Sequence, residues 1–277
     1  MSRRERFGGA LAVAPAGAAI ALLFAGAVLG AVEASVLPIP GEGLSQATLD
    51  AWRNVFRDPA LGDAIRFSVQ TTLMATLISA ALAVPAALAL RDHGPAVRSI
   101  FSAPVPVPYL VISAVATLWL AGGGLLERAL GFLPFDVVRD QAGLGIALVY
   151  VYHEVPFLTL LILASLGTEL SQREEAAAVL GASWRQRLAW VVWPVFRLPM
   201  LVGTLGVGAF VFGSFEVPLT VGPTYPETLS TLADDKLSGS AFDGRAQAAA
   251  LLVLVTAITV AITFALVWLG MRRTRRA

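Results

Sequence analysis

The sequence predicts an all-α membrane protein with six transmembrane helices, and three observations support this fold class. Hydrophobic residues make up 57% of the 277 residues and charged residues 14%, which leaves too little polar surface to cover a water-soluble globule of this size. Six apolar stretches approach or exceed the roughly 20 residues that a helix needs to cross a hydrocarbon core about 30 Å thick. Lysine and arginine fall unevenly between these stretches, as they do in oriented membrane proteins.

The six spans follow one another along residues 1–277, which we expect to form a single transmembrane domain. Each span must be helical because hydrocarbon offers no partner for exposed backbone N–H and C=O groups. The fifth span is the shortest and is rich in glycine. We predict the spans at residues 7–32, 67–90, 100–120, 144–166, 198–215 and 248–269.

The first span shares features with a secretory signal peptide, because Arg3, Arg4 and Arg6 precede an apolar run and small residues follow it. Its length argues against cleavage, since the core of a signal peptide is usually about 7–15 residues long. No clear A-x-A cleavage site closes the run either. We therefore expect this segment to remain as a transmembrane helix.

The positive charges predict the orientation of the chain. Of the 20 lysine and arginine residues, 13 lie in one alternating set of segments and 6 in the opposite set, while Arg66 lies at the mouth of the second span. Because positively charged loops stay on the cytoplasmic side, both termini are predicted to be cytoplasmic. The 13 residues are Arg3, Arg4, Arg6, Arg91, Arg98, Arg173, Arg185, Arg187, Arg197, Arg272, Arg273, Arg275 and Arg276.

The composition argues against an enzyme. The chain has no cysteine, and its two histidines, His93 and His153, are far apart and lack the spacing of metal ligands. It also has no G-x-x-x-x-G-K-[ST] motif for binding a nucleotide. We therefore predict no catalytic residue, no metal site and no cofactor in this chain, and no nucleic-acid partner.

The segment of residues 169–199, between spans four and five, is the long hydrophilic stretch on the predicted cytoplasmic side. Ser171 with Glu174 matches a capping box, in which the serine oxygen accepts backbone N–H groups at the start of a helix and the glutamate reaches back to the cap. Ser183 with Gln186 repeats this pattern. The segment is therefore predicted to contain two short helices.

A glycine turn is predicted to separate the two helices. Gly181 can take a left-handed conformation and end the first helix, and Pro194 and Pro199 are expected to limit the second. Residues 176–180 give the first helix a face of small apolar side chains, which allows a close approach to the groove of another protein. The alternative is a hairpin that rests on lipid headgroups, and the residues alone leave both open.

This helix-turn-helix loop resembles the signature of the inner-membrane permease subunits of binding-protein-dependent ABC importers. That signature is E-A-A, three residues, G, nine residues, and I-x-L-P. At the same spacing this chain has Glu175, Ala176, Ala177 and Gly181. Residues 191–194 read V-V-W-P, so valine replaces the isoleucine and tryptophan replaces the leucine. The resemblance covers most of the chain and favours docking to a protein.

The resemblance implies a permease of the type I importer fold in a bacterial-type inner membrane. In this family the loop forms coupling helices that sit in a cleft of an ATPase subunit, so that closure of an ATPase dimer on ATP moves the membrane helices. The resemblance implies that the partner binds the ATP, and that a second permease subunit and an extracytoplasmic substrate-binding protein complete the assembly. It also implies that the contact and hinge positions are Glu175, Ala176, Ala177 and Gly181.

The order of motifs is nearest to that of polyamine-type permeases. Residues 213–218 read G-S-F-E-V-P, and residues 228–230 read T-L-S. Iron, thiamine, sulfate and sugar systems are near relatives of this type. The resemblance implies a polyamine or another small cationic solute as the substrate.

Two acidic residues fall inside or at the end of predicted spans. Glu154 lies near the middle of span four, where an ionised side chain that faces lipid costs several kcal/mol, so we expect it to face protein or a water-filled path. Glu216 lies near the outer end of span five, where it borders the path or reaches to water. Both are candidates for the substrate path. For Glu154, the alternative is an acid that fixes the packing of neighbouring helices.

Two other classes of protein stay open on the residues themselves. An ion-coupled secondary transporter would use Glu154 and His153 as a proton relay and would transport without a partner ATPase. A structural membrane subunit would have no path at all. The importer subunit differs from both because it must bind a separate ATPase.

Overall fold

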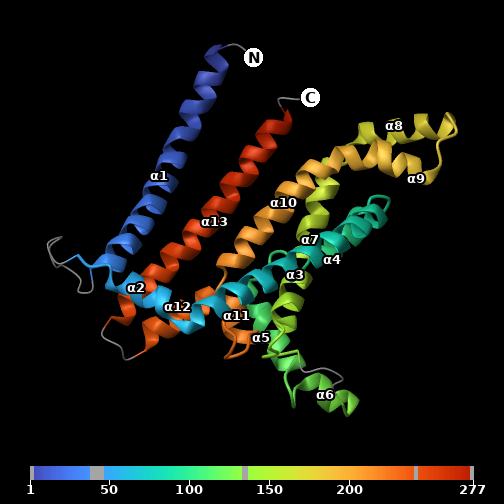
Figure 1. The fold of residues 1–277 in the computed structure, drawn as a ribbon. Coiled ribbons are helices and arrows are strands. Elements are labelled where there is room, and N and C mark those ends of the chain that lie inside the picture. The colour runs from blue at the N-terminus through green and yellow to red at the C-terminus, as the bar shows by residue number, and fades with distance from the viewer. Residues whose placement is uncertain (1–2, 38–46, 133–136, 240–242, 275–277) are drawn as a thin grey trace. The chain divides into compact units, whose positions relative to one another are not determined.

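The computed structural model describes residues 3–37, 47–132, 137–239 and 243–274, and within these ranges the chain is helical and contains no strand (Figure 1). Six helical segments in the described part of the chain are long and apolar enough to cross a membrane. The predicted all-α membrane fold with six candidate spans is thereby confirmed. The segments are Ala14–Val36, Pro59–Leu90, Tyr109–Leu130, Leu144–Ser165, Trp184–Gly213 and Gly244–Phe264.

The chain forms two compact units. The first holds residues 1–61 and 232–257, and the second holds residues 62–231 and 258–277. The first unit contains α1 (Arg3–Val36), α2 (Asp50–Arg57), most of α12 (Leu229–Ser238) and the first half of α13 (Gly244–Thr274). The second contains most of α3 (Pro59–Leu90), then α4 (Pro95–Phe101), α5 (Tyr109–Leu120), α6 (Leu125–Leu130), α7 (Leu144–Ser165), α8 (Thr168–Val179), α9 (Trp184–Arg187), α10 (Trp193–Gly213) and α11 (Glu216–Val221).

Polar side chains hold α2 in place within the first unit. The Asn54 side chain donates a hydrogen bond of 2.9 Å to Asp243, which lies just before α13. Lys236 Nζ of α12 lies 2.5 Å from Asp58 Oδ2, at the end of α2. Val55 is 1% exposed between these contacts. The short helix α2 is therefore attached to segments almost 200 residues later in the chain.

The core of the second unit is built around α7, the most deeply buried of the candidate spans. Tyr150 and Leu158 of α7 and Phe196 of α10 have no exposed surface. At Gly203 of α10, a Cβ atom would collide with the side chain of Leu161. A small residue at this position therefore allows α10 to pack closely against α7.

Three prolines displace the third span from its predicted position. Helix α4 ends at Phe101 and α5 begins at Tyr109, and the prolines lie between them. Proline lacks a backbone N–H and its ring clashes with the preceding turn, so alternating prolines cannot continue a helix. The candidate span therefore begins at Tyr109 and not at residue 100. The three prolines are Pro104, Pro106 and Pro108.

The prediction that Ser171 and Glu174 form a capping box is wrong. Helix α8 begins at Thr168, three residues earlier, and its cap is Gly167, which has no side chain to accept a hydrogen bond. Ser171 is therefore inside the helix. The carboxylate of Glu174 makes an ion pair with Arg91 at the end of α3.

The prediction that Pro194 and Pro199 limit the second loop helix is also wrong. Helix α9, a π-helical turn at Leu188–Val192 and α10 form one helical segment, Trp184–Gly213. Pro194 lies in the first turn of α10 and Pro199 lies inside it. A π-helical turn shifts the hydrogen-bond pattern by one residue, which accommodates the missing N–H of the nearby proline.

Candidate functional site

The predicted loop between spans four and five folds as a helical hairpin at one end of the second unit (Figure 1). Gly181 has a φ of +85°. Its N–H donates to Ala178 O at 2.9 Å, and the N–H of Ala182 donates to Ala177 O at 3.0 Å. This pair of bonds is the Schellman motif, which ends α8 and turns the chain. The left-handed glycine is therefore required by the backbone at this turn.

The second arm of the hairpin starts with the predicted capping box. The backbone N–H of Ser183 donates to Gln186 Oε1 at 2.8 Å, and the N–H of Gln186 donates to Ser183 Oγ at 3.4 Å. Both bonds satisfy N–H groups that have no partner inside the helix. The chain therefore leaves the glycine turn in a defined direction and enters α9.

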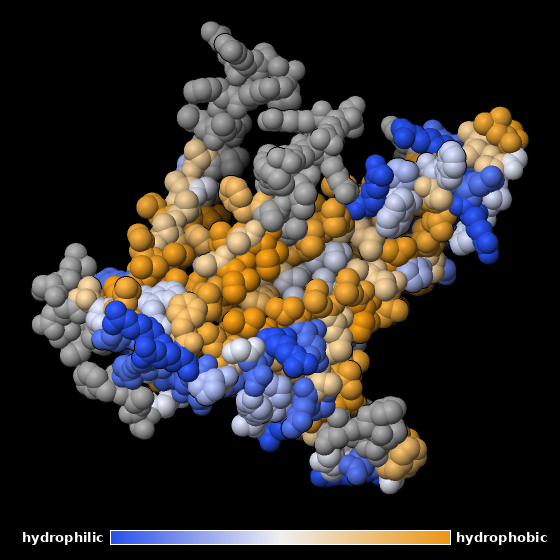
Figure 2. Space-filling view, in the orientation of Figure 1, coloured by the Kyte–Doolittle hydropathy of each residue, from blue (hydrophilic) through white to orange (hydrophobic). Residues whose placement is uncertain are grey.

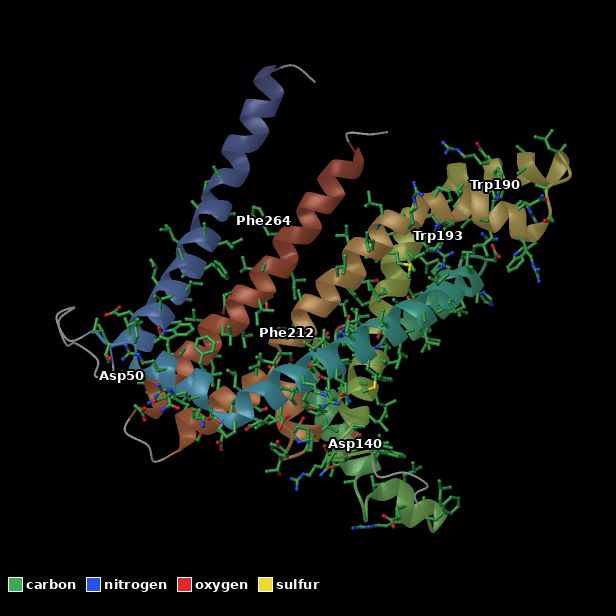
Figure 3. The ribbon with its side chains drawn as sticks, in the orientation of Figure 1. Asp50, Asp140, Trp190, Trp193, Phe212 and Phe264 are labelled. Carbon is green, nitrogen blue, oxygen red and sulfur yellow. The ribbon has the colours of Figure 1, made fainter. Side chains whose placement is uncertain are left out.

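The tip of the hairpin exposes large apolar side chains. Val179 and Leu180 are both 87% exposed, and Trp190 is 81% exposed. Figure 2 shows the hydrophobic colour at this tip next to hydrophilic side chains, and Figure 3 labels Trp190 and Trp193 on the second arm. A groove of about 380 Å³ runs beside the tip and is lined by residues of both arms, including Ala177, Gly181 and Trp190. Such a surface is typical of a contact with protein or membrane.

The four motif residues lie on this hairpin with different exposure. Glu175, Ala176 and Gly181 are exposed, and Ala177 is half-buried at the edge of the groove. The Cβ position of Gly181 meets no atom within 4 Å. A partner can therefore approach the backbone closely at this point of the turn.

Arg91 connects α8 to the second span, and sequence reasoning missed this contact. Its Nη1 lies 2.9 and 3.2 Å from the two carboxylate oxygens of Glu174. The side chains of Arg91 and Glu174 are 27% and 15% exposed. Arg98 donates hydrogen bonds to the carbonyl oxygens of Leu90, at 3.2 Å, and of Arg91, at 2.5 Å. The end of α3 is thus held together and joined to the hairpin.

A second candidate site surrounds Glu154 in α7, which is 3% exposed and so faces protein, as predicted. The hydroxyl group of Tyr109 in α5 donates a hydrogen bond to Glu154 Oε1. His153 Nδ1 lies 3.4 Å from the same oxygen, and His153 Nε2 lies 3.1 Å from Val105 O. Tyr109 of α5 and His153 of α7 therefore meet at one buried carboxylate, and His153 also contacts the segment before α5.

Glu154 lines a cavity of about 260 Å³ between α5, α7 and α10. Its walls include the aromatic rings of Tyr109, Phe157 and Phe210. The ring centroids of Tyr109 and Phe210 are 5.0 Å apart, and those of Tyr109 and His153 are 4.1 Å apart. Tyr109 and Phe210 were not predicted from the sequence, although the position of Tyr109 directly after the proline-rich entrance of a span was a usable signal.

The structure does not bring Glu216 into this cavity. Glu216 is exposed in the first turn of α11, and it is not among the residues that line the cavity around Glu154. The two acids proposed together from the sequence therefore do not line the same cavity, although both carboxylates act electrostatically on the buried Tyr150. Within the described part of the chain, no group of His, Cys, Asp and Glu residues has the arrangement of a metal site.

At the opposite end of α7 from the hairpin, Asp140 organises the chain before the helix (Figure 3). Its carboxylate accepts hydrogen bonds from the N–H groups of Ala142, Leu144 and Gly145, at 3.1, 2.9 and 3.0 Å. A carboxylate at the N-terminus of a helix satisfies free N–H groups and interacts favourably with the helix dipole. Asp140 therefore has a structural role that accounts for its position.

Comparison with known proteins gives relatives of one kind. No protein-family model matches the chain. The inner membrane ABC transporter permease protein YnjC of Escherichia coli (strain K12) is 27% identical over 255 residues, which are 90% of this chain and 49% of that protein. The thiamine transport system permease protein ThiP of Brucella abortus (strain 2308) is 29% identical over 220 residues, which are 76% of this chain and 39% of that protein. The chain thus spans half or less of the length of these two relatives.

A solved structure has a similar fold. It is the crystal structure of a bacterial ABC transporter involved in the import of the acidic polysaccharide alginate, and it matches with a TM-score of 0.73 over 98% of this chain and 96% of that chain. The sequence identity is 16%, so this likeness shows the fold alone. None of these comparisons singles out the polyamine type. By its sequence relatives, the chain is a homologue of the inner-membrane ABC transporter permeases.

Proposed function

We propose that this chain is a transmembrane permease subunit of an ATP-driven importer, with both termini in the cytoplasm. The observation that carries the proposal is the α8–α9 hairpin, in which the E-A-A residues precede a left-handed glycine and an exposed apolar tip. A hairpin of this shape offers a rigid, protruding contact for another protein. The relatives, which are ABC transporter permeases, support the same function.

The hairpin couples the membrane helices to a separate ATPase dimer. Glu175, Ala176 and Ala177 provide the contact surface, and Gly181 allows the close approach at the turn. Because α9 continues through the π-helical turn into α10, a displacement of the hairpin is transmitted directly to the fifth span. Closure of the ATPases on ATP would move this span and the α7 helix that packs against it. ATP itself binds to the partner, so this chain has no enzymatic activity of its own.

The membrane helices form half of a translocation path. A second permease subunit, either a copy of this chain or a related one, completes the path, and an extracytoplasmic substrate-binding protein delivers the solute. Glu154 borders the path, because its buried carboxylate lines a cavity. Glu216, exposed at the start of α11, lies at the outer end. The substrate is a small cationic solute, of which a polyamine is one example.

Crosslinking from the hairpin tests the proposed function. A photoreactive residue in place of Ala177, introduced into cells that make the full chain, should capture a polypeptide that azido-ATP also labels. The Glu175→Arg and Gly181→Asp variants should lose this partner. Matched controls are Glu127→Arg in α6 and Gly131→Asp directly after it, because Gly131 also ends a helix with a positive φ of 77° but lies on the predicted opposite side.

Two results would contradict the importer assignment. Crosslinks that reach only lipid headgroups would favour a hairpin that rests on the membrane. Transport by the purified chain without any ATPase, abolished by Glu154→Gln, would indicate an ion-coupled secondary transporter instead. An importer subunit, in contrast to a secondary transporter, requires the ATP-binding partner for transport.

A further inference from the structure

The carboxylate of Glu154 has too few hydrogen-bond donors for a buried anion. Tyr109 donates to Oε1, and among the described residues no hydrogen bond reaches Oε2. A carboxylate removed from water normally needs several donors or a nearby positive charge. The side chain of Glu154 is 4% exposed, so it has little contact with bulk water. Glu154 therefore has capacity for one more strong partner.

The neighbouring histidine does not fill this role when its ring is neutral. His153 Nε2 lies 3.1 Å from Val105 O, and a carbonyl oxygen can only accept, so the hydrogen is on Nε2. In the neutral ring the lone pair of Nδ1 then faces the carboxylate. Nδ1 is buried and has no hydrogen-bond partner, although it lies 3.4 Å from Glu154 Oε1. With a neutral His153, the carboxylate of Glu154 is therefore free to pair with a cation from outside these two residues.

The cavity next to Glu154 has the walls of a cation site. The rings of Tyr109, Phe157 and Phe210 line it from three different helices. Aromatic faces attract cations electrostatically, and together with a carboxylate they recognise substituted ammonium groups. Gly206 of α10 also lines the cavity, and a Cβ atom there would meet nothing within 4 Å. The α10 wall therefore leaves space next to the rings.

The volume limits what the cavity can hold. At about 260 Å³ it is slightly smaller than the roughly 300–1,000 Å³ of typical pockets for small molecules. A compact ammonium group fits this space, whereas a ring system with several substituents does not. Phe210 and Phe157 are 47% and 40% exposed, so a longer ligand could extend out of the cavity.

We infer that the cavity between α5, α7 and α10 binds the ammonium head of a small organic cation, with Glu154 as the counter-ion and the rings of Tyr109, Phe157 and Phe210 around it. The inference rests on the proposed function, because the solute path that this subunit half forms would bring the cation to the site. Binding is nevertheless a property of this chain alone. It can be measured without the ATPase, so the two proposals can fail separately.

Equilibrium binding to the full chain in lipid nanodiscs tests the inference, with radiolabelled choline as the probe. Its neutral isostere, in which carbon replaces the quaternary nitrogen, has the same shape without the charge. Choline should bind in a saturable manner, and the isostere should compete at least about 10-fold less well, since the ring faces and the carboxylate distinguish them by charge. Methylammonium and putrescine should compete with choline for the same site.

Variants assign the binding to this cavity. Glu154→Gln should weaken choline binding by at least about 10-fold, because it removes the counter-ion. Phe210→Leu keeps an apolar side chain at an exposed position, so it should fold, and it should weaken binding by about 3- to 30-fold through loss of the ring face. The matched control Glu127→Gln removes an acid in α6 that does not line the cavity, and it should leave the Kd unchanged.

Three outcomes would overturn the inference. Choline and the isostere could compete equally, which would make the cavity an apolar groove. Choline, methylammonium and putrescine could all fail to show saturable binding. Phe210→Leu and Glu127→Gln could have equal effects, which would place the binding elsewhere. Capture of an ATPase by the hairpin together with any of these outcomes would leave the proposed function standing without this site.

Discussion

Replacing Arg91 by glutamine removes the charge that pairs with Glu174 and leaves a half-buried carboxylate without its counter-ion. Arg91 Nη1 contacts both oxygens of Glu174, at 2.9 and 3.2 Å, and the two side chains are 27% and 15% exposed. Exposed ion pairs contribute about 0.2–1 kcal/mol, and breaking a fully buried pair costs about 3–5 kcal/mol. An intermediate cost of about 1–2 kcal/mol is therefore expected for this pair.

The cost should appear as easier local opening of α8. A free-energy change of about 1–2 kcal/mol corresponds to a roughly 5- to 30-fold increase in the population of the open state. Hydrogen–deuterium exchange of the full chain in lipid nanodiscs measures this directly. The amides of α8 should exchange faster in the Arg91→Gln variant, while the central amides of α7 should not change.

A matched variant and a charge swap complete this test. Arg185 in α9 is an exposed arginine on the same hairpin, and Arg185→Gln should leave exchange in α8 within about 2-fold of the original. The exchanged pair, Arg91→Glu with Glu174→Arg, should recover part of the lost protection, since the charges again attract. Equal effects of Arg91→Gln and Arg185→Gln would refute the idea that the ion pair attaches α8 to α3.

Three further predictions concern stability. Gly181→Ala should destabilise the hairpin by about 1–2 kcal/mol, because φ is +85° there and an L side chain strains that conformation; faster amide exchange in α8 and α9 would show it. Gly145→Ala should destabilise the fold more, by about 2–3 kcal/mol, because a Cβ atom would collide with the carbonyl oxygen of Val137. A lower Tm for Gly145→Ala than for Gly181→Ala would confirm that it is the more destabilising change. Burial tends to raise the pKa of Asp58, but hydrogen bonds from Lys236 and a backbone N–H outweigh it and hold this pKa below its usual value. The resulting stabilisation is present at neutral pH and is lost as the pH falls below about 4, so the Tm difference between the original chain and Asp58→Asn should disappear in acid.

Much of the fold could be predicted because it follows from the solvent. A hydrocarbon core demands continuous apolar helices, so hydropathy and length were sufficient to find six candidate spans. The turn of the hairpin could also be predicted, because Gly181 and the Ser183–Gln186 box act on backbone groups within a few residues. Local chemistry of this kind depends little on the rest of the molecule.

Local signals failed where a more distant partner competed for the same group. Glu174 was expected to reach back to Ser171, but its carboxylate contacts Arg91, which is 83 residues away in the sequence. The prolines at positions 194 and 199 were expected to stop a helix, but packing of α10 against α7 and a π-helical turn maintain it. In both cases tertiary contacts stabilise a conformation that the local sequence disfavours.

By itself, the sequence determined the kind of protein, the number of candidate spans and the position of the glycine turn, since each of these depends on composition or on neighbours within a few residues. Only the tertiary structure decided which side chains meet. It placed Tyr109 against Glu154 and Phe210 across from Tyr109, and it kept Glu216 out of the same cavity. The physical reason is that a buried charge is stabilised by whichever groups the packed helices bring within hydrogen-bond distance, and spacing along the chain does not specify that set.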